Sequence, residues 1–194
     1  PLGNAINDAE YLNKTMEENF RIKKTIIFKD ISSSDFRDSL DKILHDYDFK
    51  KGSQLMLYFS GHGTIDHNDE RILCFKDYSK QKRHSAVRVS DIESTIKRKS
   101  EKSNLTNCLF IIDACNQGYD VNNKKHRLNY EPIVIGKNFK TGVEKYSINY
   151  INNSVRIKTF VEFSSSLSDQ EYKEGRGKNG PFITSFVDAI ISES

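Results

Sequence analysis

The sequence has little of several residue types that mark special classes of protein. Among 194 residues it has no tryptophan, three prolines and three cysteines. Cys74, Cys108 and Cys115 are odd in number and widely spaced, which argues against a disulfide framework. Because disulfides are rare in reducing compartments, these thiols favour an intracellular, cytoplasmic protein.

Long hydrophobic runs are also absent. No apolar run approaches the roughly 20 residues that a membrane-spanning helix needs. The first residues lack the apolar core of a signal peptide. The sequence therefore predicts no membrane segment.

An excess of charge of one sign is lacking as well. Lys and Arg total 30 against 27 Asp and Glu, a net charge of +3. Basic clusters occur at residues 97–99 and 124–127, but acidic residues are interspersed elsewhere. A nucleic-acid-binding protein usually concentrates its basic residues on one element, so we expect no nucleic-acid partner.

What is present is the ordinary composition of a globular domain, with 36% hydrophobic and 29% charged residues. Periodicity predicts helices over residues 5–20, 89–99 and 181–191, with Ser90 opening the second of these. Another helix should begin at Ser33 or Ser34 and place Phe36, Leu40, Ile43 and Leu44 on one face. Apolar runs predict strands at residues 25–28, 54–60, 71–75, 108–113 and 157–163, with 54–60 buried on both faces.

This alternation of helices and strands is typical of a mainly parallel sheet covered on both sides. The expected fold class is α/β, a three-layer α/β/α sandwich that forms a single domain over residues 1–194. Residues 116–154 are weakly patterned, and only residues 132–135 offer a short strand there. A connection of this length predicts a flexible, functional loop.

Two apolar strands end in unusual polar residues. Residues 58–63 carry His62 between two glycines, and residues 111–118 carry Cys115. Ligands bind beyond the carboxyl ends of strands in an open α/β sheet, so neighbouring strands would bring His62 and Cys115 face to face. An imidazole can take the proton of a thiol and later protonate a leaving amine. The N–H groups of Gly63 and Cys115 would then form an oxyanion hole.

Each of these residues alone has an ordinary explanation, since a lone Cys is more often a core residue and a His between glycines a loop residue. The pair carries more weight. His62 precedes Cys115 by 53 residues, close to the roughly 50-residue offset described for caspases. We therefore interpret them as a catalytic dyad.

The Ser-Gly-His-Gly and Asp-Ala-Cys segments resemble those of the caspase-like cysteine peptidase superfamily. They are nearer to the metacaspases and paracaspases than to animal caspases, which usually have Gln-Ala-Cys. The resemblance runs from residues 4–9, Asn-Ala-Ile-Asn-Asp-Ala, to residues 179–182. It implies a caspase-like fold and a cysteine endopeptidase. The family's first core strand normally precedes the Asn-Asp-Ala segment, so we expect that strand to be missing and the chain to be part of a longer protein.

The resemblance also implies a substrate pocket. In metacaspases the residues that match Asp8, Ser60 and Asp113 line it, and Asp169 would border the groove. Two carboxylates in one partly desolvated pocket favour Lys or Arg and repel an acidic side chain. Taken singly, Asp8 could be a helix N-terminal residue favoured by the dipole. Asp113 alone could be a strand-end carboxylate bonded to backbone N–H groups, and Asp169 a solvated loop residue.

The weakly patterned segment lies where related proteases carry a processing loop. Its basic residues match the implied specificity and make it a candidate for self-cleavage: Lys124, Lys125, Arg127, Lys137, Lys140 and Lys145.

This sequence does not match the acidic clusters that bind calcium in many metacaspases. Asp66, Asp69 and Glu70 are scattered, and Asn122 stands at the approximate downstream position. A zinc site built from the cysteines would lack the usual ligand spacing. We therefore expect no required metal and no other cofactor. The remaining histidines should lie on surfaces or loops: His45, His67, His84 and His126.

Two alternatives stay open. The same fold could be a catalytically silent scaffold that binds partners, although such a protein has no chemical need for both His62 and Cys115. A nucleotide-binding module would need a Gly-rich phosphate loop, and residues 61–63 lack its glycines and its Lys. The expected partners are protein or peptide substrates, together with a regulatory domain or partner outside this chain.

Overall fold

The computed structural model describes residues 4–66, 68, 70–79, 81–114, 117–118, 144–148, 159–164 and 179–192. Its helices are α1 (Ala5–Asn19), α2 (Ser33–Asp46), α3 (Val89–Ser100) and α4 (Pro181–Ser192), with a short 3-10 turn at Arg83–Ser85. Its strands are β1 (Ser53–Ile65), β2 (Arg71–Cys74), β3 (Ala86–Arg88), β4 (Leu105–Ala114), β5 (Gln117–Gly118), β6 (Glu144–Ile148) and β7 (Thr159–Ser164).

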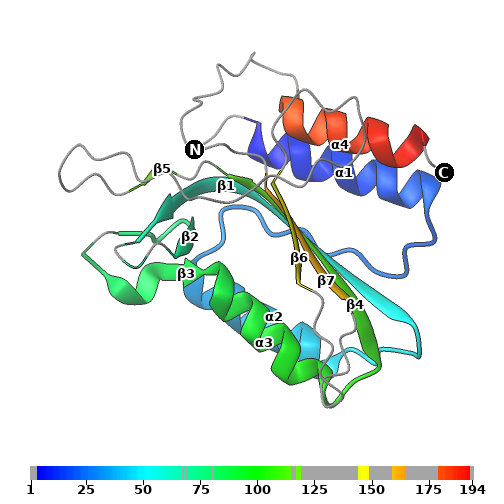
Figure 1. The fold of residues 1–194 in the computed structure, drawn as a ribbon, viewed down its shortest axis with the longest axis horizontal. Helices are drawn as coiled ribbons and strands as arrows, with labels where there is room; N and C mark the ends of the chain where they lie inside the picture. Colours follow the sequence, from blue (N-terminus) through cyan, green and yellow to red (C-terminus); the bar gives the residue numbers. More distant parts are fainter. Residues whose placement is uncertain are drawn as a thin grey trace.

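The strands form one mixed sheet in the order β3-β2-β1-β4-β7-β6, with β5 beside β1 (Figure 1). Its centre is parallel, because β1 pairs with β4 and β4 pairs with β7 in the same direction. Its two sides are antiparallel, where β2 joins β1, β3 joins β2 and β6 joins β7. The predicted parallel arrangement therefore describes the centre of the sheet and not its margins.

The helices cover both faces of the sheet, as Figure 1 shows. On one face, α2 and α3 pack a core around Phe110 and Ile112, contributing Leu40, Ile92 and Ile96. On the other face, α1 and α4 pack a second core around Ile111, with Leu12, Ile183 and Val187. Successive residues of β4 thus serve opposite cores, as the period of two in a strand requires. The three-layer α/β/α fold is confirmed.

The helices lie where periodicity predicts them, but two predicted caps are wrong. The N-cap of α2 is Ser32, whose hydroxyl accepts the Asp35 N–H at 3.1 Å. Ser33 instead donates both its N–H and its hydroxyl to Asp77, each at 2.7 Å. Ser90 lies inside the first turn of α3, where its hydroxyl contacts Glu70 at 3.4 Å. Several serines can cap a helix equally well in sequence, and the tertiary partner decides among them.

Residues 25–28 do not form the predicted strand. The segment has no regular secondary structure, because no strand in the described part of the chain pairs with it, and a strand needs a partner for its backbone groups. Its side chains are correspondingly exposed, with Ile26 and Phe28 each at 42%. β-Branched, apolar composition predicted a strand here, but composition alone does not supply a pairing partner.

The prediction that residues 54–60 are buried on both faces is also wrong, since most of β1 is half-buried. Along Ser53–Gly61, β1 pairs with β4 on one side, and no described strand pairs with its other edge. β4 lies between two strands, and its Phe110, Ile111 and Ile112 are fully buried. Burial follows the position in the sheet rather than the apolar character of the strand.

The weakly patterned region contains more regular structure than predicted. β5 and β6 both lie within residues 116–154, and β6 pairs antiparallel with β7. The strand predicted at residues 132–135 lies outside the described residues. The expectation of a missing first strand stays a prediction.

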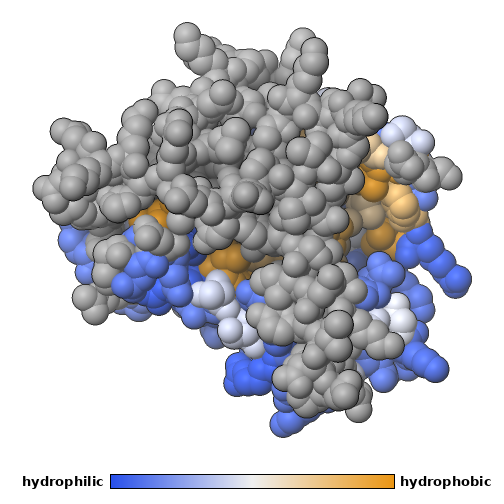
Figure 2. All heavy atoms as spheres, in the orientation of Figure 1, coloured by the Kyte–Doolittle hydropathy of each residue, from blue (hydrophilic) through white to orange (hydrophobic). Residues whose placement is uncertain are grey.

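Hydrophilic residues gather over α2 and α3, whereas hydrophobic ones are visible on the side where α1 and α4 end (Figure 2). The apolar composition of α4 accounts for part of this, and its Ile191 is 43% exposed. Within the described residues, no helix combines the length and hydrophobicity required to cross a bilayer.

We predict that Asp77→Ala destabilises the fold through the amino end of α2. Burial alone would raise the pKa of Asp77, but the two Ser33 hydrogen bonds outweigh it and lower the pKa below 3.8. Losing an exposed capping carboxylate costs about 1 kcal/mol, or about 2–4 °C in melting temperature for a chain of this size. Thermal melts of Asp77→Ala and of the exposed loop variant Asp48→Ala test this, and equal melting temperatures would contradict it.

Candidate active site

His62 lies within β1 and not beyond its end, which corrects the prediction of a strand that ends at residue 60. The strand continues through Gly61, His62 and Gly63 to Ile65. Parallel pairing with β4 extends to Gly61 opposite Ala114, and antiparallel pairing with β2 begins at His62 opposite Cys74. The His motif therefore lies where β1 changes its partner.

The glycine before His62 serves packing rather than a turn. A Cβ at Gly61 would stand 2.8 Å from a carbon of the Phe59 ring, closer than real Cβ contacts allow. That ring lies 5.4 Å from the Phe75 ring, against the core under α2 and α3. A glycine at position 61 thus leaves the space that the Phe59 ring occupies.

The alternation of β1 and β4 places the predicted polar residues on one face of the sheet. Tyr58 and Ile111 both belong to the core under α1 and α4. Ser60 and Asp113 follow two residues later on their strands, so they lie on the same face, and they are register partners. His62 follows Ser60 by two more residues and is exposed. Ser60, Asp113 and His62 therefore lie toward one end of the layer formed by α1 and α4.

Asp8 joins this group from α1. A Cβ built at Gly180 would lie 3.1 Å from Asp8 Oδ2 and 3.7 Å from Asp113 Oδ2. The two carboxylates, from here on the acidic pair, thus border the same small space beside Gly180. Elements distant in sequence bring them together, since Asp8 lies on α1, Asp113 on β4 and Gly180 before α4 (Figure 1).

Asp8 also has the helix-terminal role that its sequence position suggested. It lies in the first turn of α1, its side chain is only 3% exposed, and its Oδ1 accepts the Gly180 N–H at 2.8 Å. Gly180 immediately precedes α4, so this carboxylate faces the positive amino ends of two helices. These groups offset the cost of burying a charge and hold Asp8 in place.

Tyr58 is a residue of this site that sequence reasoning missed. Its hydroxyl is buried and meets the distance and angle of a hydrogen bond with none of the described residues, although Ser60 and Asp113 lie close enough to affect its ionisation. Burial raises the pKa of Tyr58 far above its ordinary value, and the Asp113 charge raises it further, so the phenol stays protonated. A buried polar group without a partner costs about 1–3 kcal/mol. The signal in the sequence was a polar tip within an otherwise apolar strand.

The described thiols differ sharply in chemistry. Burial, followed by the nearby Glu93 charge, raises the pKa of Cys108 to about 12. This core thiol does not ionise at neutral pH and is excluded as a nucleophile. Cys74 is half-buried and lies directly across the β1–β2 ladder from His62, a neighbour that spacing alone did not reveal.

The structure describes only some of the other predicted site residues. Cys115 and Asp169 lie outside the described residues. Gly63 lies in the antiparallel ladder opposite Leu73, so its part in an oxyanion hole stays a prediction. His45 and His84 lie on the surface as predicted, and His67 and His126 are outside the described residues.

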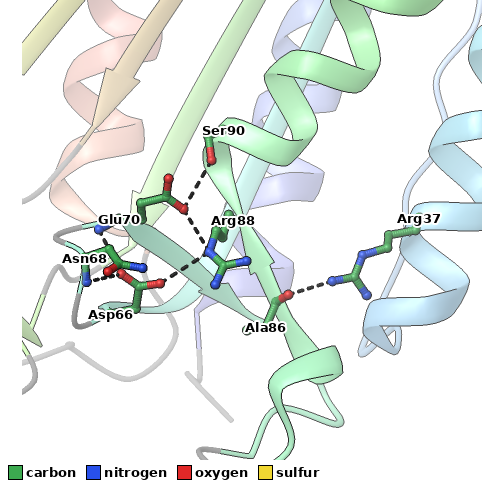
Figure 3. A network of polar contacts seen from close by, with 7 residues as sticks. All are labelled: Arg37, Asp66, Asn68, Glu70, Ala86, Arg88 and Ser90. Atoms are coloured by element: carbon green, nitrogen blue, oxygen red, sulfur yellow. Dashed lines mark hydrogen bonds and ion pairs between the residues drawn. The ribbon is translucent and has the colours of Figure 1, made fainter.

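An ion-pair network holds the turn that follows His62 (Figure 3). Arg88 of β3 contacts Glu70 at 2.8 Å and Asp66 at 3.3 Å. Asp66 also accepts the backbone N–H groups of Asn68 and Glu70. On the other side of β3, Arg37 donates to the Ala86 carbonyl at 2.6 Å and so ties α2 to this strand.

This network uses two of the three acids that could have suggested calcium. Asp66 and Glu70 both pair with Arg88, whose positive charge takes the place that a cation would need. Asp69 lies outside the described residues. The absence of a required metal stays a prediction.

A separate hollow of about 700 Å³ lies near the amino end of α2. Residues 27–32, Asp35, Lys76 and Asp77 line it. None of the predicted catalytic or pocket residues borders this hollow. We therefore place the candidate site at the acidic pair and His62.

The comparison with known families agrees with the fold. The family model described as the caspase domain matches residues 1–194. The chain belongs to the caspase-domain family. This is a family of cysteine-type peptidases, which are hydrolases, and its fold is the α/β fold described above. A search of curated proteins finds no match.

We predict that Arg88→Met loosens the turn after His62 in this caspase domain. Burial would raise the pKa of Asp66, but the Asn68 and Glu70 N–H groups and Arg88 outweigh it and hold the pKa below 3.8. The ionised carboxylate therefore stabilises the fold at neutral pH, and this contribution is lost as pH falls through the lowered pKa. A half-exposed network of this kind contributes about 1 kcal/mol.

The variant should melt about 2–4 °C lower at pH 7, and the difference should shrink below pH 3.8. Arg98→Met, at an exposed position of α3, is the matched control. A deficit that persists unchanged in acid would show that Arg88 acts through packing and not through charge.

Proposed function

We propose that this caspase-domain protein is a cysteine endopeptidase in which His62 and Cys115 form the catalytic dyad, and that it cleaves peptide bonds after Lys or Arg. The observation that carries the proposal is the acidic pair. Asp8 and Asp113 border one space, beside Ser60, on the face of the sheet that carries His62. A pocket of this composition selects a cationic side chain.

The register of β1 supports the choice of Cys115 as nucleophile. Gly61 pairs with Ala114 and Thr64 pairs with Gln117, so β1 keeps an offset of 53 residues on both sides of His62. His62 and Cys115 are separated by the same 53 positions. Side chains at matched positions of neighbouring parallel strands point to the same face.

In the proposed reaction, His62 takes the proton of the Cys115 thiol, and the thiolate attacks the carbonyl carbon of the scissile bond. The N–H groups of Gly63 and Cys115 donate to the oxyanion that develops. His62 then protonates the leaving amine as the C–N bond breaks, which leaves a thioester. Water, deprotonated by His62, hydrolyses the thioester and releases the thiol.

The acidic pair accounts for the proposed specificity. A Lys or Arg side chain entering beside Gly180 would meet carboxylate oxygens of both Asp8 and Asp113. Hydrogen bonds between charged partners are about twice as strong as neutral ones. An acidic side chain would meet two like charges and be rejected. We also propose that Asp169 borders the groove.

The remaining parts of the proposal concern surroundings and partners. Cys74 and Cys108 are thiols, which suits a reducing, cytoplasmic setting. The proposed partners are protein or peptide substrates, with regulation from a domain or protein outside this chain. Kinship to metacaspases and paracaspases within the family is part of the same proposal.

A panel of fluorogenic peptides with Lys, Arg or Asp at the cleaved position tests the function. Wild type should cleave the Lys and Arg peptides and leave the Asp peptide intact. Cys115→Ala should lower kcat/KM by at least about 1000-fold, because the nucleophile is lost. Asp113→Asn keeps the shape but removes a charge, and should lower kcat/KM for both basic peptides about 100-fold.

Cys74→Ala is the matched control for the thiol, because Cys74 lies opposite His62 yet is not the proposed nucleophile. It should retain activity. Loss of activity in Cys74→Ala with retention in Cys115→Ala would overturn the dyad. Turnover of the Asp peptide alone would overturn the pocket, and no turnover by wild type would favour a silent scaffold.

We further predict self-cleavage within the segment after Cys115. Lys145 lies in β6, paired with Phe163, and a paired strand is a poor substrate. Cleavage is therefore expected beside one of the other basic residues of the segment: Lys124, Lys125, Arg127, Lys137 or Lys140. Incubated wild type should fragment, Cys115→Ala should stay intact, and mass spectrometry should find the new ends after basic residues. Equal fragmentation of both proteins would rule self-cleavage out.

A further inference from the structure

A row of three aromatic rings reaches from α2 to the backbone beside His62. The Phe36 and Phe75 rings stack with their centroids 4.5 Å apart, and the Phe59 ring lies 5.4 Å from the Phe75 ring. All three belong to the core under α2 and α3, where Phe36 and Phe75 are buried and Phe59 packs against them from β1. The row ends at Gly61, since a Cβ there would stand 2.8, 3.1 and 3.6 Å from the Cζ, Cε1 and Cε2 atoms of the Phe59 ring.

The Phe59 ring and the His62 imidazole lie on opposite faces of β1. Side chains two residues apart on a strand share a face, so residue 61 faces the same core as Phe59. Ser60 and His62 face the other way, toward the acidic pair. The ring therefore contacts the backbone from the face that lies away from the proposed substrate pocket.

The backbone at Gly61 has little other support. Its ladder with β4 ends here, opposite Ala114, and the ladder with β2 begins only at His62. Among the residues that the structure describes, none pairs with the opposite edge of β1 at this position. Glycine also restricts its own backbone least of all residues. Because the peptide before His62 sets the direction of its Cα–Cβ bond, a shift at Gly61 would move the imidazole.

We infer that Phe59 is a positioning residue for His62: its ring holds the Gly61 backbone from the opposite face of the strand and so fixes where the imidazole stands. The effect on catalysis rests on the proposed function, whereas the effect on the placement of His62 does not. A displacement of about 1 Å can lower the rate of a catalysed step about 100-fold. A small loss of support under His62 should therefore be measurable.

Phe59→Leu deletes Cε1, Cε2 and Cζ, the three ring atoms that lie near Gly61. The residue stays apolar, so the variant should fold, with a melting temperature about 2–6 °C lower. Its kcat for Lys and Arg peptides should fall about 10- to 100-fold because the imidazole is less well placed. KM should change less than about twofold, since the substrate pocket lies on the other face.

Gly61→Ala tests the same contact from the backbone side. Its methyl group would stand 2.8 Å from Cζ of the Phe59 ring, so the ring or the backbone must move and kcat should fall. In the double variant Phe59→Leu/Gly61→Ala, the methyl group enters the space that the ring atoms leave. The kcat of the double variant should therefore recover at least about threefold relative to Phe59→Leu. Additive losses would overturn the inference, because groups that act independently show additive effects.

Phe36→Leu is the matched control, because Phe36 belongs to the same row and the same core but stands at its far end. It should lower the melting temperature by a similar amount and leave kcat within about twofold of wild type. If both variants lower kcat in proportion to their loss of stability, Phe59 acts only through the core and the inference fails.

The NMR signals of the His62 ring test its placement without catalysis. In Cys115→Ala protein, which should not cleave itself, the Cε1–H signal of His62 should shift or broaden when Phe59→Leu is added. The signal of His45, whose side chain is 73% exposed, should stay unchanged and serves as the internal control. An unchanged His62 signal would overturn the inference. If wild type cleaves no basic peptide but the His62 signal responds, the proposed reaction fails while the role of Phe59 in placing this side chain stands.

Discussion

Between Gln54 and Gly61, β1 lies beside β4 in an unbroken parallel register, and the positions of Ser60, His62 and Asp113 all depend on that pairing. A slip of one residue would turn each of these side chains to the other face of the sheet. The register is held by the core side chains of β4, where Phe110, Ile111 and Ile112 are fully buried between the helical layers. Each such side chain contributes about 1.5–3 kcal/mol when buried. Hydrophobic packing on both faces thus fixes where the polar residues at the end of the ladder lie.

The α1–α4 layer completes the site by bringing Asp8 and Gly180 to the same place. This arrangement works against stability in two ways. Two carboxylates border one space, and the Tyr58 hydroxyl is buried without a partner in the described part of the chain. Helix amino termini and the Gly180 N–H offset part of the charge cost. Unfavourable local features of this kind are expected where a protein binds a charged ligand.

The antiparallel strands β2 and β3 support the part of β1 that carries His62. β1 changes partner at His62, and β2 and β3 hold the continuation of the strand from the other side. Arg88 then ties the following turn to β3 through Asp66 and Glu70. The imidazole therefore stands on a strand supported at both ends and not on a free loop, which suits a group that must be positioned accurately.

The sequence by itself determined the caspase-like α/β fold, the helices, and the central strands, because helical and strand periodicities are local and strong in this chain. Its motifs also named Asp8, Ser60, Asp113 and His62 before any contact was known. It could not decide the antiparallel margins, the exposure of residues 25–28 or the N-cap of α2, since each depends on a partner distant in sequence. Only the tertiary structure put Tyr58 and Gly180 beside the acidic pair and Cys74 opposite His62. The reason is physical: periodicity assigns a residue to a face, but only sheet register and helix packing decide which faces meet.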